Sequence, residues 1–306
     1  MRKHLAVAAL AAITLGTLAP AAPAQDRKTI GRGSILNNDL IGDGRDRWRT
    51  GGYTLSLTRA PGWDGQRPGR PFALTELRLH GQIVAPARLT APSATDRRYA
   101  GLLSVGLHTH FNRGAVELSG GADLVAVGPS TQLGGFQSAI HGLFGLPSPD
   151  TARANQLPDA LYPTVLVEAG LPMQAGFARI RPFVEAQAGV ETFARIGADV
   201  AIGAFGQGDV TVRDTVTGHL YRATKTAPPT GFTFVFGGDV AHVASSALLP
   251  AAGAATLRAT RTRLRAGFHW QGERAELFYG ITRLGREFEQ QPVEQTVGSI
   301  HLRIRF

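Results

Sequence analysis

One histidine of this chain lies in a short segment whose residue pattern differs from that of its surroundings. Within residues 134–145, apolar side chains recur at the i, i+4, i+7, i+8 spacing of a helix face: Phe136, Ile140, Leu143 and Phe144. Gln137 precedes His141 by one helical turn, so the two side chains share a face of the predicted helix. A neutral imidazole, with an ordinary pKa of about 6.5, can take a proton from water at neutral pH. His141 is therefore a candidate general base, and the alternative is an ordinary interfacial histidine on a loop helix.

Oxygen-bearing side chains gather in two further motifs. The first is Asn37-Asn38-Asp39, and the second is the segment DRWRTGG at residues 46–52, which includes Thr50. Carboxylate oxygens are ligands that a hard cation such as Ca²⁺ takes, and a bound cation can polarise an ester carbonyl. Asn and Asp also start turns by bonding to the backbone, so a simple strand end is the competing interpretation of Asn38 and Asp39.

Two other groups of residues give weaker signals. Arg97 and Arg98 follow Asp96, and a guanidinium matches the geometry of a phosphate, so these arginines are either substrate contacts or parts of a structural ion-pair cluster. His108 and His110 share one face of a predicted strand at a spacing that can bind a metal. No third ligand is evident, so we predict that these two histidines face a polar interior.

The segments around these motifs alternate apolar and polar residues with period two, which is the pattern of strands with one face toward lipid. Twelve such segments are predicted, near residues 30–38, 50–60, 71–85, 99–111, 114–127, 161–171, 176–190, 195–205, 229–244, 254–270, 273–284 and 296–306. An even number of antiparallel strands is what a closed bacterial barrel requires. The predicted fold is all-β, a transmembrane antiparallel up-and-down barrel of about 12 strands with a short helix in an extracellular loop, and residues 206–228 are assigned to no strand.

The N-terminal residues and the composition indicate an exported protein. Residues 1–24 combine a basic start, an apolar stretch and the small residues Ala22-Pro23-Ala24, which predicts a signal peptide followed by a barrel over residues 25–306. No later segment offers the roughly 20 uninterrupted apolar residues of a membrane helix. The 306 residues include no cysteine and carry a net charge of +9. A cationic surface suits phosphorylated lipid, and export argues against nucleic acid as a partner.

Strand parity assigns each connection to one side of the membrane. With both termini in the periplasm, the connections 39–49, 86–98 and 128–160 are extracellular, whereas 112–113 and Gly272 mark short periplasmic turns. The helical segment, and with it His141, is therefore expected at the outer rim. The polar motifs that end strand one and open strands two and four should lie at the same rim.

Taken in order, these motifs resemble a known family. NND at 37–39, RDRWRTGG at 45–52, GQ at 81–82, DRRYAG at 96–101, VGP at 127–129 and QxxxH at 137–141 follow one another as in the lipid A 3′-O-deacylase (LpxR-type) outer-membrane barrels. The resemblance covers essentially the whole mature chain. It implies a twelve-stranded barrel with an active site between the outer barrel wall and a small helix, and a calcium-dependent hydrolysis that removes the 3′-linked acyl chains of lipid A.

Carried over residue by residue, the resemblance gives each motif a role. His141 becomes the general base, Asp39 the calcium-associated carboxylate, and Asn38 and Thr50 polar partners in the same site. A second group supplies substrate contacts, namely Arg97, Arg98 and Gln137. The implied partners are lipopolysaccharide and the outer membrane, with the active-site rim facing the outer leaflet and the barrel expected to be a monomer. No serine nucleophile is required, which suits a chain without a G-x-S-x-G motif.

The chain departs from the family pattern at two places. Pro147 stands where an acidic residue is expected about six positions after the histidine, and a lysine that accompanies the Asp-Arg motif has no counterpart at residues 94–98. These departures keep two alternatives open. One is a non-catalytic barrel, either a channel or a structural family member, and the other is a phospholipase on the same scaffold.

Overall fold

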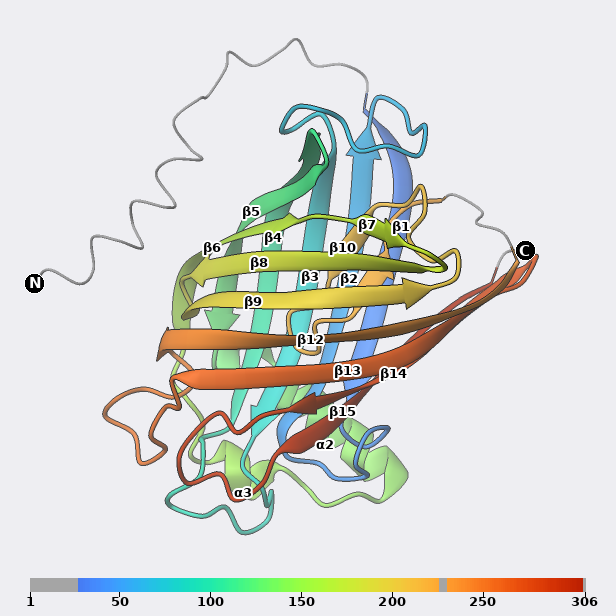
Figure 1. Cartoon of the computed structure of the whole chain (residues 1–306). Coiled ribbons are helices and arrows are strands. Elements are labelled where there is room, and N and C mark those ends of the chain that lie inside the picture. The colour runs from blue at the N-terminus through green and yellow to red at the C-terminus, as the bar shows by residue number, and fades with distance from the viewer. Residues whose placement is uncertain (1–26, 226–229, 305–306) are drawn as a thin grey trace, which may run out of the picture.

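Twelve long strands form a closed antiparallel barrel in the computed structural model, which describes residues 27–225 and 230–304 (Figure 1). Their bounds are β1 Lys28–Asn38, β2 Trp48–Ala60, β3 Thr75–Ala85, β4 Ala100–Arg113, β5 Val116–Val127, β6 Ala160–Gly170, β8 Ala178–Ala188, β9 Glu191–Ile202, β12 Gly231–Ser246, β13 Thr260–Gln271, β14 Ala275–Leu284 and β15 Gln295–Ile304. Each strand pairs with the next, β6 pairs with β8 and β9 with β12, and β15 returns to β1. The twelve-stranded barrel is thus confirmed, and the predicted signal peptide lies outside the described residues.

Alternation along each strand separates two environments. In β4, Leu103, Val105 and Leu107 are exposed on the outer face, whereas His108 and His110 are buried in the lumen. This apolar-out, polar-in pattern is the one that a barrel needs when its outer face meets hydrocarbon. None of the helices in the described part of the chain combines the length and apolar character needed to cross a membrane.

Several predicted boundaries are wrong by a few residues. The strands predicted at 71–85 and 254–270 begin only at Thr75 and Thr260, because the residues before them form loops. The turn predicted at 112–113 lies instead at Gly114 and the residue after it, between β4 and β5. Gly114 has a φ of 59°, a left-handed conformation that glycine adopts at low cost in a two-residue hairpin turn.

A hairpin folds into the lumen from the connection between β9 and β12, the region that sequence analysis left unassigned. Its strands are β10 Thr211–Arg213 and β11 Leu220–Arg222, and Figure 1 shows β10 within the ring of long strands. Its side chains reach opposite walls: Arg213 lies 2.7 Å from Asp199 of β9, and the Tyr221 hydroxyl lies 2.7 Å from that of Ser56 of β2. A short strand, β7 Met173–Ala175, extends the barrel at β8.

The seam between the first and last strands is short. β1 and β15 pair over three residues, from Leu36↔Ile300 to Asn38↔Gly298, whereas β1 pairs with β2 along almost its whole length. Away from the seam, the lumenal hairpin covers the inner backbone of β1. A Cβ added at Gly31 would lie 2.2 Å from the carbonyl oxygen of Ala223, so only glycine permits this approach.

One end of the barrel carries the helices. The connection 128–159 holds η1 Pro129–Thr131, α2 Leu133–Phe144 and α3 Asp150–Arg153, and it lies at the same end as the connections 39–47 and 86–99 (Figure 1). α2 confirms the helix predicted at 134–145. It ends where Gly145 takes a φ of 65° and donates its N–H to the carbonyl of His141, a common helix stop.

Candidate functional site

α2 turns its polar face toward the barrel and its apolar face away from it. Gln137 and His141 are only 6% and 5% exposed, whereas Phe136, Leu143 and Phe144 are each more than 60% exposed. The exposed side chains are those whose spacing predicted an apolar helix face. A helix that buries its polar side and exposes its apolar side is suited to a position between a protein wall and lipid.

The helix lies against the outer wall at β3 and β4. Gly101 of β4 alternates in step with the outward-facing Leu103, and a Cβ added there would lie 2.5 Å from the Thr131 hydroxyl and 3.0 Å from Leu133. A larger residue than glycine would therefore push the start of α2 off the wall. Further along the helix, the Tyr99 hydroxyl donates a hydrogen bond of 2.8 Å to the Gln137 side-chain carbonyl.

His141 has a neighbour at each ring nitrogen. Its Nε2 lies 3.0 Å from a carboxylate oxygen of Asp46, in the connection between β1 and β2. Its Nδ1 lies 2.5 Å from the backbone carbonyl oxygen of Pro147. Pro147, which stands where the family pattern has an acidic residue, thus contacts His141 through its backbone carbonyl.

Asp46 connects His141 to two other predicted site residues. Its second oxygen accepts a hydrogen bond from the Thr50 hydroxyl and another, of 3.3 Å, from the Gln137 amide. Neither Asp46 nor Tyr99 was predicted as a site residue, although both lie within the motifs that carry the family resemblance. Any of the acids at 39, 43 and 46 could have turned toward the helix, and no periodicity distinguishes them.

Thr50 lies at an irregularity in β2. The register between β2 and β3 shifts between Arg49 and Gly51, which is the signature of a β-bulge. Arg49 points into the lumen, where it pairs with Glu287 and Glu191, while Thr50 reaches Asp39 and Asp46. The bulge therefore brings the Thr50 hydroxyl to the helix side of the wall.

Asp39 is fully buried beside this group. It accepts hydrogen bonds from the Arg47 backbone at 2.7 Å and from Gln295 at 3.2 Å, and the Thr50 hydroxyl oxygen lies 3.3 Å from its other oxygen. Burial raises the pKa of Asp39 to about 8; the Arg47 backbone N–H opposes the shift, and the neighbouring acids Asp46 and Asp43 add to it. Asp39 is thus a buried carboxyl group with acidic neighbours and no cationic side chain bonded to it.

The chemistry of Asp39 fits a hard cation. An uncompensated buried carboxylate is costly, and a Ca²⁺ ion, which takes oxygen ligands, would relieve that cost. Within residues 27–225 and 230–304, no group of three or more His, Cys, Asp or Glu side chains is arranged around a common metal position. The role of Asp39 as a carboxylate that holds a cation stays a prediction, and so does calcium.

Three other predicted site residues have structural contacts. The Asn38 side chain accepts a hydrogen bond of 2.7 Å from the Leu40 backbone, as expected of a turn residue at the rim. Arg97 is buried and pairs with Glu287 at 2.6 Å, and Arg98 donates to the backbone carbonyls of Asn155 and Gln156. Of the two alternatives for Arg97, this geometry favours the structural ion-pair cluster, since its guanidinium is engaged inside the barrel.

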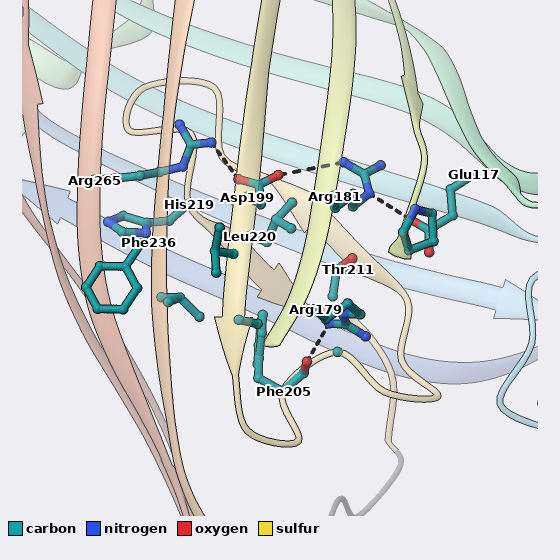
Figure 2. A pocket seen from close by; sticks show the side chains of 15 residues that line it. Glu117, Arg179, Arg181, Asp199, Phe205, Thr211, His219, Leu220, Phe236 and Arg265 are labelled. Atoms are coloured by element: carbon teal, nitrogen blue, oxygen red, sulfur yellow. Dashed lines mark hydrogen bonds and ion pairs between the residues drawn. The ribbon is translucent and has the colours of Figure 1, made fainter. Parts of the chain in front are cut away.

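The lumen is occupied by paired charges. His108 lies 3.1 Å from Asp123, and His110 lies 2.7 Å from Glu76, so each faces the interior with its own acid, as predicted. Figure 2 shows side chains that line a cavity beside the lumenal hairpin. The cavity has a volume of about 40 Å³. Its lining includes an ion-pair chain that runs from Arg265 through Asp199 and Arg181 to Glu117. Such a space is too small for a lipid.

The fold and the helix-covered polar group on its outer wall define the class of this protein, an outer-membrane β-barrel with a candidate site at the lipid boundary. The family model described as "Outer membrane protein LpxR" matches residues 5–306. The chain belongs to the LpxR family.

The fold agrees with that of a solved structure. LpxR from Salmonella typhimurium has 16% sequence identity and a TM-score of 0.72, with 90% of this chain and 100% of that chain covered. The beta domain of the Bordetella autotransporter Brka has 11% sequence identity and a TM-score of 0.48, with 90% of this chain and 99% of that chain covered. No curated protein sequence matches the chain.

Proposed function

We propose that this protein is an outer-membrane lipid A deacylase that hydrolyses an acyl ester of lipid A, with the 3′-linked chains as the expected substrate. The observation that carries the proposal is the orientation of α2. The helix buries His141 and Gln137 against the barrel wall and exposes Phe136, Leu143 and Phe144 on its other side. The esters of lipid A lie where acyl chains meet sugar, and a site with an apolar outer surface and a polar inner one matches that boundary.

The side chains present can carry out ester hydrolysis with water as the nucleophile. His141 in its singly protonated form takes a proton from water, and the resulting hydroxide attacks the ester carbonyl. Gln137 and Thr50 hold Asp46, which contacts the imidazole. The proton on His141 is then available to the leaving alkoxide, so the imidazole returns to its starting state and the fatty acid departs.

Calcium is part of the proposal, and Asp39 is the residue that would hold it. When bound, the cation would polarise the ester carbonyl and stabilise negative charge on its oxygen. Asn38, at the adjacent end of β1, remains a proposed polar partner at the rim. Arg98 remains a proposed substrate contact, although its present bonds hold the segment after α3.

Mass spectrometry of lipid A tests the proposal. Purified protein incubated with lipopolysaccharide and calcium should lower the lipid A mass by its ester-linked chains. His141→Ala should abolish this change, a loss of at least about 100-fold in rate, because general-base catalysis contributes about that much or more. His242→Ala is the matched control, since His242 is exposed on β12, far along the chain from α2. Unchanged lipid A mass with the wild-type protein would reject the proposal.

The alternatives predict other outcomes. A phospholipase would release fatty acid from glycerophospholipids in a parallel assay and leave lipid A intact. A channel would require an open lumen, but the hairpin of β10 and β11 contacts β2 and β9 on opposite sides of the barrel. The buried hairpin therefore favours the enzyme over the channel.

A further inference from the structure

β1 carries a charged side chain on its lipid-facing side. Gly31 and Gly33 face the lumen, since a Cβ added at either would lie 2.2 Å from a carbonyl oxygen of the hairpin segment, and Arg32 between them is exposed on the opposite face. On the twelve described wall strands, every other Lys, Arg, Asp or Glu that alternation turns outward lies within two residues of a strand end. Arg32 is the fifth residue of β1. A charge in this position is costly unless it reaches water or an opposite charge.

The strand register places Arg32 at the edge of the outer apolar band. It lies opposite Leu57 of β2, which pairs with Leu77 of β3, and Leu77 pairs with Leu107 of β4. Leu77 and Leu107 are 42% and 55% exposed on the outer face. The next outward residue of β2 beyond Leu57 is the exposed Arg59. From this level a long arginine side chain can reach the head groups at the barrel end opposite α2.

Two further guanidinium groups lie near Arg32. Arg59 is its diagonal neighbour across the β1–β2 pair, a spacing that long side chains can span. Arg303 of β15 donates hydrogen bonds to the backbone carbonyls of Arg32 and Thr224, and Glu276 inside the barrel lies 3.5 Å from it. Within their described bounds, β1, β2 and β15 contain no Asp or Glu. The outer face at this point is therefore cationic.

The seam interrupts the wall beside Arg32. In the described chain, the residues of β1 before Leu36 pair with none of β15, and Figure 1 shows the two strands apart at the end opposite α2. The Ile30 carbonyl accepts from the Lys225 backbone at 2.9 Å instead, and the Arg32 carbonyl accepts from the Arg303 side chain. Polar groups of the seam thus meet the lipid side where the other strands form a continuous sheet.

We propose that this cationic seam, formed by Arg32, Arg59 and Arg303, binds the phosphate of an anionic phospholipid. The lipid lies in the leaflet at the barrel end opposite α2, which is the phospholipid leaflet under the proposed orientation. Each guanidinium presents a fork of N–H donors that matches a phosphate, and the acyl chains lie against Leu57 and Leu77. A zwitterionic head group brings its own cation, so the site favours a lipid with net negative charge. The inference goes beyond lipid A hydrolysis and does not depend on it.

Native mass spectrometry of the protein in detergent, titrated with phosphatidylglycerol or phosphatidylcholine, tests the proposal. The wild type should bind phosphatidylglycerol at least about tenfold more tightly than phosphatidylcholine. Arg32→Gln/Arg59→Gln should lose that preference. Arg70→Gln/Arg113→Gln removes two exposed arginines from the same end of the barrel and should keep it. Equal binding of the two lipids by the wild type, or an equal loss in both double variants, would overturn the proposal.

A competition arm separates a lipid from a free anion. Inorganic phosphate in large excess should leave phosphatidylglycerol bound, because the acyl chains contribute to its retention. Displacement by inorganic phosphate would identify the ligand as a free anion and overturn the assignment to a lipid. Heat-dependent gel mobility shows which variants form folded barrels. The lipid preference of the wild type needs no variant, so it decides the proposal even where a substitution impairs folding.

Discussion

At the scale of single residues, Asp39 is the group that a cation would change most. Its carboxyl is buried, and no cationic side chain bonds to it, so a bound Ca²⁺ should stabilise the folded state. We expect saturating calcium to raise the thermal unfolding midpoint of the wild type, with about 2.7 kcal/mol gained at a hundredfold excess over Kd. Asp39→Asn should lose that increase, and chelation should stop hydrolysis by the wild type.

The matched control for Asp39→Asn is Asp64→Asn. Asp64 lies in the connection between β2 and β3, at the opposite end of the barrel, and its side chain accepts a hydrogen bond from the Gln66 backbone. Its replacement should leave the calcium-dependent midpoint unchanged. An equal calcium response in wild type and Asp39→Asn would show that the cation binds elsewhere.

Residue types and spacing predicted part of the site. His141 and Gln137 were placed on one helix face by a period of 3.6, and the structure keeps both on the buried face. Asp46 was missed because irregular loops have no period, so the sequence does not determine which acid meets the helix. The sequence left two alternatives open for Arg97 for a related reason: its partner in the ion pair, Glu287, lies 190 residues away.

At the scale of elements, the apolar face of α2 should matter more in a bilayer than in detergent. Leu143 and Phe144 are 75% and 69% exposed, so replacing both with serine removes apolar surface without opening the protein core. Each side chain contributes up to about 2 kcal/mol when it enters hydrocarbon. We expect Leu143→Ser/Phe144→Ser to hydrolyse lipopolysaccharide in vesicles at least about tenfold more slowly, with a smaller loss in detergent micelles.

A control for the α2 variant comes from a strand. Leu264 of β13 is 67% exposed on the outer face, and β13 does not contact α2. Leu264→Ser should leave the rate of hydrolysis unchanged both in vesicles and in micelles. If Leu143→Ser/Phe144→Ser lost the same fraction of its hydrolysis rate in vesicles and in micelles, the apolar face of α2 would not act through contact with the bilayer.

Elements with a regular period were predictable, and those without one were not. The twelve strands and α2 follow from periods of two and 3.6. The lumenal hairpin has strands of three residues each, too short for alternation to stand out, and its partners come from opposite walls of the barrel. Its position therefore depends on contacts that form only once the barrel exists.

At the scale of the whole molecule, one prediction concerns the acid stability of the barrel end that carries α2. Burial would raise the pKa of Glu287, but Arg49, Arg261 and Arg97 outweigh it and hold the pKa well below its ordinary range. A carboxyl group whose pKa is lower in the folded state than in the unfolded state stabilises the fold at pH values above its unfolded pKa, about 4.5. This stabilisation is lost as the pH falls from there through the folded pKa. Glu287→Gln should lower the free energy of unfolding by about 3–5 kcal/mol at pH 7.

Denaturant unfolding in detergent at several pH values measures this effect. The difference between wild type and Glu287→Gln should shrink as the pH is lowered below about 4.5, because the unfolded wild type then binds a proton at Glu287 that the folded wild type does not bind. Glu289→Gln is the control, since Glu289 and its partner Arg258 are largely exposed and such a pair contributes at most about 1 kcal/mol. A pH-independent difference would contradict the assignment to the Glu287 charge.

A second prediction at this scale concerns conductance. The hairpin packs apolar side chains, among them Val210, Val212 and Tyr221, against β1 and β14 inside the lumen. The wild type should not conduct ions in planar bilayers. Replacing residues 209–224 by a short Gly/Ser linker should open the lumen and produce stepwise currents. A steady open-pore current from the wild type would contradict the closed lumen and favour the channel alternative.

The short seam between β1 and β15 constrains the order in which this molecule can be made. The hairpin lies against the inner backbone of β1, so close that Gly31 can carry no side chain. Because β9 and β12 hold both ends of the hairpin segment, we expect the hairpin to dock on β1 while the sheet is still open. The three residue pairs from Leu36 to Asn38 would then form last.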